Sequence, residues 1–145
     1  MAIHPNGNLI SSSWDKSIKI WNPNSGQLIK TLNGHNDYIM SVVVLSNNTA
    51  ASSTRSGQLF IWDINNGTIL YNLNTSLYQI LNLVCLQNGN LAAGAYGKQV
   101  EIWNPYNGSL VATLISNVSS KVSTNAYLKY PWVYEGLFRK INLLI

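Results

Sequence analysis

The sequence predicts an all-β fold in which one small antiparallel unit is copied along the chain. Trp21, Trp62 and Trp103 are spaced at a constant interval of 41 residues (62 − 21 = 41 and 103 − 62 = 41). Each tryptophan ends a short apolar run and is followed five residues later by a glycine, at Gly26, Gly67 and Gly108. No stretch has the i, i+3, i+4 spacing of an amphipathic helix. A constant period of this size indicates one repeated structural unit.

Period-two alternation locates the strands of the first copy. We expect strands at residues 8–13, 18–21, 27–32 and 38–45. Residues that favour turns, mainly Asn, Asp, Gly, Pro and Ser, separate these runs at 15–17, 22–26 and 33–37. The order of strands and turns indicates consecutive hairpins, which form a small antiparallel sheet.

The next two copies repeat this order. The second copy predicts strands at 50–54, 59–62, 68–73 and 79–86, and the third at 91–95, 100–103, 109–114 and, more weakly, 126–127. A sheet of four short strands cannot bury its own faces, so neighbouring sheets must stack. The sequence therefore predicts a β-propeller built from four-stranded antiparallel blades.

The period also predicts the boundaries of the repeats. Repeat 1 spans about 1–34, repeat 2 about 35–75, repeat 3 about 76–116, and a truncated repeat 4 about 117–145. Both outer repeats are cut within strands, and closing a ring takes at least about four blades. We expect an incomplete ring, an arc that needs missing blades or a second copy to close it. A piece of a longer protein is the favoured interpretation, and a self-sufficient chain is the alternative.

The composition argues against several classes of protein. Nine Lys and Arg residues against five Asp and Glu give a net charge of +4, but the basic residues are spread thinly. Nucleic-acid binding needs a basic face or stripe, so we expect no nucleic-acid partner. No run of about 18 apolar residues is present, so we expect no membrane partner. Cys85 is the only cysteine, which excludes an intrachain disulfide. We expect a cytoplasmic location, with the nucleus as the alternative.

At these residues the chain resembles the WD-repeat family of β-propellers. Trp62 and Asp63 match the Trp-Asp pair that ends a repeat, and Gly34 and His35 match the Gly-His pair that opens one. Residues 13–21 are close to the family pattern that runs from the second strand to the third. The resemblance covers essentially the whole chain.

The resemblance implies a buried hydrogen-bond chain in each blade, made of a histidine, a hydroxyl, an aspartate and the tryptophan. The residues at these motif positions are Asp15, Trp21, His35, Trp62 and Trp103. The hydroxyl is expected at Ser12 or Ser13 in the first copy and at Ser53 or Thr54 in the second. Ser56 and Gly97 stand at the aspartate position of later copies, and Ser76 stands at that of His35. No copy holds the complete set.

Catalysis has little support in this pattern. No repeat combines serine, histidine and aspartate, so His35 and Asp15 are interpreted as structural residues. His4 lies in a turn, and the two histidines have no metal-ligand spacing relative to carboxylates. We expect no enzyme activity, no catalytic residue, no metal and no cofactor.

The resemblance also implies that partners dock on the face that carries the loops between fourth and first strands and the turns between second and third strands. Trp14, Arg55 and Tyr96 occupy equivalent positions there, again 41 residues apart (55 − 14 = 41 and 96 − 55 = 41), and Tyr38 and Met40 flank them. Trp, Arg and Tyr are enriched at interaction hot spots. We expect these residues to bind other proteins or peptides, which makes the chain a protein–protein interaction scaffold. The alternative is that Trp14 and Tyr96 only cover the blade edge.

Two further functional hypotheses stay open. A quinoprotein-like propeller enzyme or cofactor binder would need a charged cluster in the central channel, and the inner-strand runs at 42–44 and 83–85 carry no charge. An inactive gene fragment is the other alternative.

Overall fold

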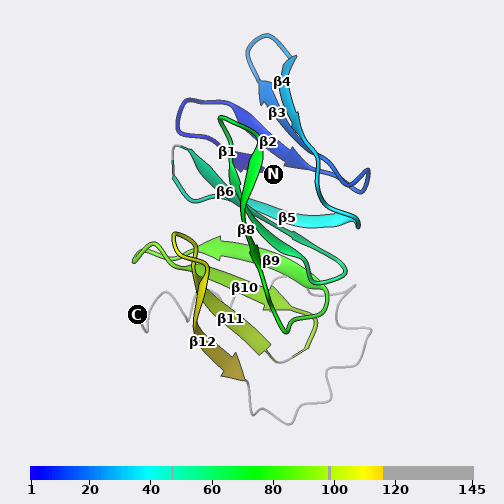
Figure 1. Cartoon of the computed structure of the whole chain (residues 1–145). Helices are drawn as coiled ribbons and strands as arrows, with labels where there is room; N and C mark the ends of the chain where they lie inside the picture. The colour runs from blue at the N-terminus through cyan, green and yellow to red at the C-terminus, as the bar shows by residue number, and fades with distance from the viewer. Residues whose placement is uncertain (47, 98, 116–145) are drawn as a thin grey trace, which may run out of the picture. The chain divides into compact units, whose positions relative to one another are not determined.

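The computed structural model describes residues 1–46, 48–97 and 99–115. These residues form three four-stranded antiparallel sheets (Figure 1), which confirms the predicted all-β fold of propeller blades. The expected repeat 4, with its weak strand at 126–127, lies outside the described residues.

Each sheet is one blade, and each uses four consecutive strands. Blade 1 contains β1 (Ala2–Ile3), β2 (Leu9–Ser12), β3 (Ile18–Asn22) and β4 (Gln27–Leu32). Blade 2 contains β5 (Ile39–Val44), β6 (Thr49–Thr54), β7 (Leu59–Asp63) and β8 (Thr68–Leu73). Blade 3 contains β9 (Ile80–Cys85), β10 (Leu91–Ala95), β11 (Gln99–Asn104) and β12 (Ser109–Ile115). The strands follow sequence order across each sheet, so hairpin turns make every connection within a blade.

A β-bulge lies at the repeated tryptophan of every blade. The pairing of the third strand with the fourth shifts between Ile20 and Trp21, and again at the equivalent steps before Trp62 and Trp103. A bulge bends the strand and changes the direction of the following side chain. The sequence pattern predicted strands that end at the tryptophans, but it did not predict the β-bulge.

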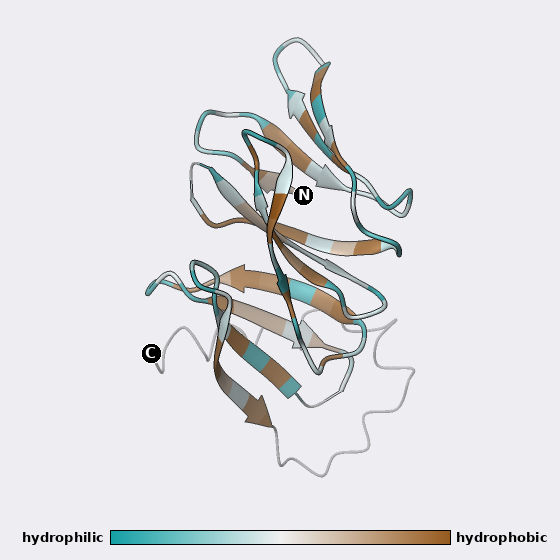
Figure 2. Cartoon of the chain, viewed as in Figure 1, coloured by the Kyte–Doolittle hydropathy of each residue, from teal (hydrophilic) through white to brown (hydrophobic). Residues whose placement is uncertain are grey.

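The hydrophobic core lies between blades, as the small size of each sheet requires. Consecutive residues of blade 2 serve opposite interfaces, because side chains alternate across a strand. Phe60 and Trp62 pack against blade 1, whereas Leu59 and Ile61 pack against blade 3. Trp62 is completely buried. Figure 2 shows that the strands carry most of the hydrophobic residues and the turns most of the hydrophilic ones.

The glycines that follow Trp62 and Trp103 allow neighbouring blades to approach closely. Gly67 and Gly108 have positive φ angles of 79° and 72°, a region that L side chains rarely adopt. A Cβ on Gly108 would also lie 3.1 Å from Cδ1 of Tyr71, on the outer strand of the preceding blade. The Tyr71 hydroxyl donates to the carbonyl of Tyr106 at 3.0 Å, which ties that strand to the next blade's turn.

Gly108 adopts a positive φ angle and also leaves room for the neighbouring blade. Comparing Gly108→Ala with Gly26→Ala separates these two roles. Gly26 has nearly the same φ, 70°, but a Cβ there would meet nothing within 4 Å. Gly26→Ala should therefore lose only the backbone contribution, about 1–2 kcal/mol of unfolding free energy. Gly108→Ala should lose about 1–3 kcal/mol more, because the added methyl crowds Tyr71. Denaturant unfolding measures both losses, and equal losses would contradict the packing role.

Candidate functional site

The three turns between second and third strands carry the predicted binding residues. Trp14, Arg55 and Tyr96 lie in the β2–β3, β6–β7 and β10–β11 turns, and all three side chains are exposed. These turns follow one another along the right-hand side of Figure 1. The backbone N–H of Arg55 donates to the carbonyl of Tyr38 at 3.0 Å, and that of Tyr96 to the carbonyl of Gln79 at 2.9 Å. We call this surface the Trp14 edge.

Trp14 and Tyr38 stack on one another across the boundary between blades 1 and 2. Their ring centroids are 5.5 Å apart with an interplanar angle of 14°. The N–H of Ile39 donates to the carbonyl of Ser13 at 3.3 Å, which holds the two segments together. Trp14 nevertheless remains 66% exposed, so most of its ring faces solvent. Met40 is half-buried and presents less surface. The sequence predicted these residues but not the stacking between blades.

Asp15 organises the β2–β3 turn rather than a buried hydrogen-bond chain. Its carboxylate accepts from the Lys19 ammonium at 2.6 Å, from the Ser17 hydroxyl at 2.6 Å and from the Ser17 backbone N–H at 2.9 Å. The hydrogen bond from Lys19 and those from Ser17 hold the pKa of Asp15 well below its usual range. The carboxylate is therefore ionised at neutral pH and closes the turn that presents Trp14.

Blade 2 contains a continuous buried hydrogen-bond chain. The Trp62 indole N–H donates to Oγ of Ser52 at 2.7 Å, and Nε2 of His35 lies 2.6 Å from the same oxygen. Nδ1 of His35 lies 3.3 Å from Oε1 of Gln58, an oxygen that also accepts from the N–H of Asn36. His35 therefore carries its proton on Nδ1, and Nε2 accepts from the Ser52 hydroxyl. Among the described residues, no buried side-chain nitrogen or oxygen lacks a hydrogen-bond partner, and this includes the atoms that link Trp62, Ser52 and His35.

Burial explains why His35 is neutral. The imidazole stacks on Phe60 with ring centroids 4.3 Å apart and an interplanar angle of 6°. Loss of hydration disfavours the charged ring and lowers the pKa of His35 to about 4, although the hydrogen bond with Gln58 opposes this shift. At neutral pH the uncharged ring has a structural role, in which it links Ser52 and Gln58 by hydrogen bonds.

The hydroxyl partners differ from those expected from the sequence. In blade 1 the Trp21 indole donates to Ser11 at 2.9 Å, not to Ser12 or Ser13. In blade 2 the partner is Ser52, not Ser53 or Thr54. Strand pairing explains both corrections. Ala50 lies opposite Trp62, so Ser52, two residues further, shares the tryptophan's face while Ser53 points to the other side.

Blade 3 supplies its hydrogen-bond acceptor from a different strand. Ala93 stands where blade 2 has Ser52, and Glu101 stands where it has Phe60 (93 − 52 = 41 and 101 − 60 = 41). Oε2 of Glu101 accepts from the Trp103 indole at 3.1 Å, and Oε1 accepts from the Ser76 hydroxyl at 2.5 Å and backbone N–H at 3.1 Å. Glu101 is 1% exposed. The repeat pattern does not predict this role for Glu101, although an acidic side chain within an apolar strand is a signal that the sequence contains.

The described part of the chain contains no arrangement suited to metal binding. Among these residues, no group of three or more His, Cys, Asp and Glu side chains could hold an ion. Burial raises the pKa of the Cys85 thiol, which favours its protonated form. In the same residues no helix is long and apolar enough to cross a membrane.

The neutral state of His35 predicts a pH dependence of stability. An unfolded histidine binds a proton near pH 6.5, whereas folded His35 binds one only near pH 4. Lowering the pH through this window therefore favours the unfolded state, by up to about 3 kcal/mol. Chemical unfolding between pH 7 and 4 should show a steeper loss for the wild type than for His35→Gln, and parallel curves would contradict this assignment. Asp15 loses its stabilising contribution only below about pH 3.8, its unfolded value.

The role of Glu101 as the acceptor for Trp103 can be tested by building the hydrogen-bond arrangement of blade 2 into blade 3. Glu101→Phe leaves the buried Trp103 N–H without its acceptor and should cost about 1–3 kcal/mol of unfolding free energy. Adding Ala93→Ser and Ser76→His supplies the serine and histidine of blade 2 and should recover part of that loss. Thermal and denaturant unfolding measure both steps. Additive losses from the three substitutions would show that the two arrangements are not equivalent.

Comparison with known families and proteins supports the geometry. Residues 1–22 and 26–63 match the WD40 family, described as WD domain, G-beta repeat. A stretch of 51 residues is 43% identical to the COMPASS component SWD3 of Saccharomyces cerevisiae and covers 34% of this chain. A stretch of 45 residues is 38% identical to the small ribosomal subunit protein RACK1y of Oryza sativa subsp. japonica and covers 31% of this chain. These stretches cover only 16% and 13% of the two relatives.

The fold is also similar to a solved propeller. The crystal structure of the WD40 beta propeller domain of Doa1 aligns with a TM-score of 0.70 and 26% sequence identity. The alignment covers 76% of this chain and 37% of that one. The matched repeats, the order of strands in each blade and the hydrogen-bonded tryptophans agree: residues 1–22 and 26–63 carry WD40 repeats, and the described residues fold as consecutive blades of a β-propeller.

Proposed function

We propose that this chain is a non-enzymatic platform that binds other proteins or peptides through the Trp14 edge. The observation that carries this proposal is the stacked pair of Trp14 and Tyr38, which joins two blades and leaves 66% of Trp14 and 37% of Tyr38 exposed. An exposed aromatic ring held in one orientation offers a large contact area at little entropic cost.

Arg55 and Tyr96 extend this surface along the next two blades. The Tyr96 ring is 45% exposed, and the backbone hydrogen bonds of both residues fix their turns. Trp, Tyr and Arg are the side chains that contribute most often to binding hot spots. Their equivalent positions would let one extended segment or one protein surface contact several blades.

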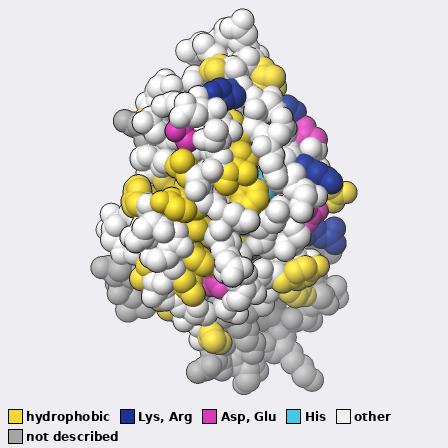
Figure 3. All heavy atoms as spheres, viewed as in Figure 1, with side chains coloured by type: hydrophobic (Ala, Val, Ile, Leu, Met, Phe, Trp, Pro, Cys, Tyr) yellow, Lys and Arg dark blue, Asp and Glu magenta, His cyan; other side chains and the backbone are white. Residues whose placement is uncertain are grey.

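The relatives support a role in assembly, as a proposal for this chain. Two of them are named as parts of larger assemblies, a small ribosomal subunit protein and a COMPASS component. Charged side chains of both signs are interspersed on the face seen in Figure 3, which favours protein partners over nucleic acid. A cytoplasmic or nuclear location and a longer parent protein that completes the ring belong to the same proposal.

The test compares substitutions on the Trp14 edge with a matched exposed aromatic elsewhere. The triple variant Trp14→Ala, Arg55→Ala, Tyr96→Ala should lose the proteins that co-purify with the wild type from cell extract, as measured by quantitative mass spectrometry. Tyr106→Ala should retain them, because this exposed ring lies in the β11–β12 turn at the other end of the strands. Trp14→Phe should also retain them, since it preserves stacking.

Folding is the necessary control for this comparison. Trp14 and Tyr96 are exposed, so their truncation should change the unfolding free energy by less than about 1 kcal/mol. Retained capture by a folded triple variant would overturn the assignment of the site. Equal loss of capture with Tyr106→Ala would show that the interaction does not depend on the Trp14 edge.

A further inference from the structure

A small pocket lies between blades 1 and 2, at the edge of the sheets opposite Trp14. It has a volume of about 230 Å³. One side is formed by the β1–β2 turn through His4, Asn6 and Asn8, and the other by Lys30 of β4 and Asn65 of the β7–β8 turn. Successive hairpin turns alternate between the two edges of a sheet, so these turns lie away from the β2–β3 turn that carries Trp14. We propose that this pocket binds the free carboxyl terminus of a peptide whose last residue is branched and aliphatic.

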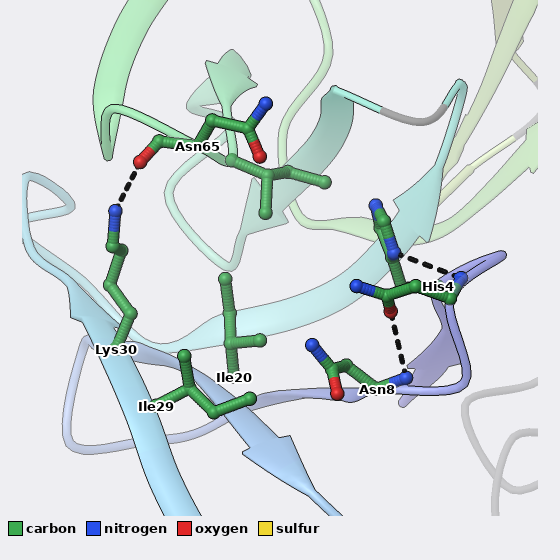
Figure 4. A pocket seen from close by; sticks show the side chains of 8 residues that line it. His4, Asn8, Ile20, Ile29, Lys30 and Asn65 are labelled. Carbon is green, nitrogen blue, oxygen red and sulfur yellow. Dashed lines mark hydrogen bonds between the residues drawn. The ribbon is translucent and has the colours of Figure 1, made fainter.

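The charge of the pocket favours an anionic group. Figure 4 shows the Lys30 amine next to Asn65, whose backbone carbonyl accepts a hydrogen bond from it. An ammonium group has three donor hydrogens, so this contact orients the amine and leaves donors for a ligand. Among the described residues that line the pocket, none is Asp or Glu. The neighbouring Asp63 accepts from the side chain and backbone of Asn66, at 2.8 and 2.9 Å, within its own turn.

The floor of the pocket favours an aliphatic body. Ile20, Ile29 and Ile64 line it, and Ile20 and Ile29 lie between Lys30 and His4 in Figure 4. The amide of Asn8 can donate to a carboxylate or to a peptide carbonyl. Nδ2 of Asn65 already donates to Oδ1 of Asn48 at 2.9 Å, which leaves its second amide hydrogen for a ligand. A ligand that places a carboxylate beside Lys30 and a branched side chain on the isoleucines would satisfy both surfaces.

The size of the pocket points to the end of a chain. Sites that enclose whole small molecules are typically about 300–1,000 Å³. A volume of about 230 Å³ is below this range and suits one terminal residue of a longer ligand. A peptide carboxyl terminus carries its anion and its last side chain on the same carbon, which matches a cation beside an apolar floor.

The next junction of blades shows that this chemistry is not a general property of the fold. Tyr71 and Tyr106 of blades 2 and 3 stand at the positions of Lys30 and Asn65 (71 − 30 = 41 and 106 − 65 = 41). The Tyr71 hydroxyl makes the equivalent hydrogen bond to the carbonyl of Tyr106, but through a neutral phenol. The cation and the small amide are therefore specific to the junction of blades 1 and 2.

The experiment titrates the full chain with three peptides and follows its backbone amide signals by NMR. N-acetyl-Gly-Gly-Val with a free carboxyl terminus is the expected ligand. Its carboxyl-terminal amide lacks the charge, and N-acetyl-Gly-Gly-Gly lacks the aliphatic side chain. The valine acid should bind at least about tenfold more tightly than either control, and its shifts should centre on Ile20, Lys30 and Asn65. Equal binding of the amide, or shifts confined to another surface, would overturn the proposal.

Substitutions of Lys30 and Asn65 measure how much each residue contributes to peptide affinity. Lys30→Met keeps the alkyl stem and should weaken binding about tenfold, whereas Lys30→Arg should retain it. Asn65→Tyr introduces the residue of the next junction and should block the pocket. If Asn65→Tyr disturbs folding, the comparison of Lys30→Met with Lys30→Arg decides the question. Wild-type affinity in both Lys30→Met and a folded Asn65→Tyr would refute the proposed site.

Two controls show whether the effect is local and independent of the Trp14 edge. Lys19→Met removes another blade 1 cation, one paired with Asp15 in the salt bridge near the opposite edge, and should leave peptide affinity unchanged. Trp14→Ala should also leave it unchanged. This result distinguishes failure of the pocket from failure of the protein-binding platform.

Discussion

Blades 2 and 3 are each organised around one constraint, which is that a buried indole N–H needs a hydrogen-bond acceptor. Trp62 is fully buried and Trp103 nearly so, and a desolvated donor without a partner costs roughly 1–3 kcal/mol. A β-bulge precedes Trp62 and Trp103, and both rings pack in the interface with the preceding blade, on the same side as their acceptors. Packing between blades and hydrogen bonding within a blade are therefore satisfied by the same side chain.

Blades 2 and 3 meet this constraint with different chemistry. In blade 2 Ser52 relays between the indole and His35, which requires a neutral imidazole that both donates and accepts. In blade 3 the Glu101 carboxylate accepts from all of its partners directly, so Ala93 can replace the serine. Repeats can thus lose the family's usual residues and still leave no buried side-chain donor unpaired among the described residues.

The sequence predicted local features well and contacts between blades poorly. Alternation and turn residues located the strands, because both depend on neighbours along the chain. The choice of Ser52 over Ser53 depends on which residue lies opposite Trp62, which is a property of strand pairing. The stacking of Trp14 on Tyr38 and the pocket beside Lys30 depend on how two blades meet. The spacing of residues within one repeat does not show how the side chains of two neighbouring blades meet.

The division of blade 2 between two interfaces restricts how such a chain can vary in length. Phe60 and Leu59 are adjacent in sequence but belong to different cores. Inserting or deleting one residue within β7 would exchange the two sets, so that each would face the core that fits the other. Insertions and deletions are therefore tolerable only in the turns or as whole repeats. The surfaces free to diversify are the two edges where Trp14 and Lys30 lie.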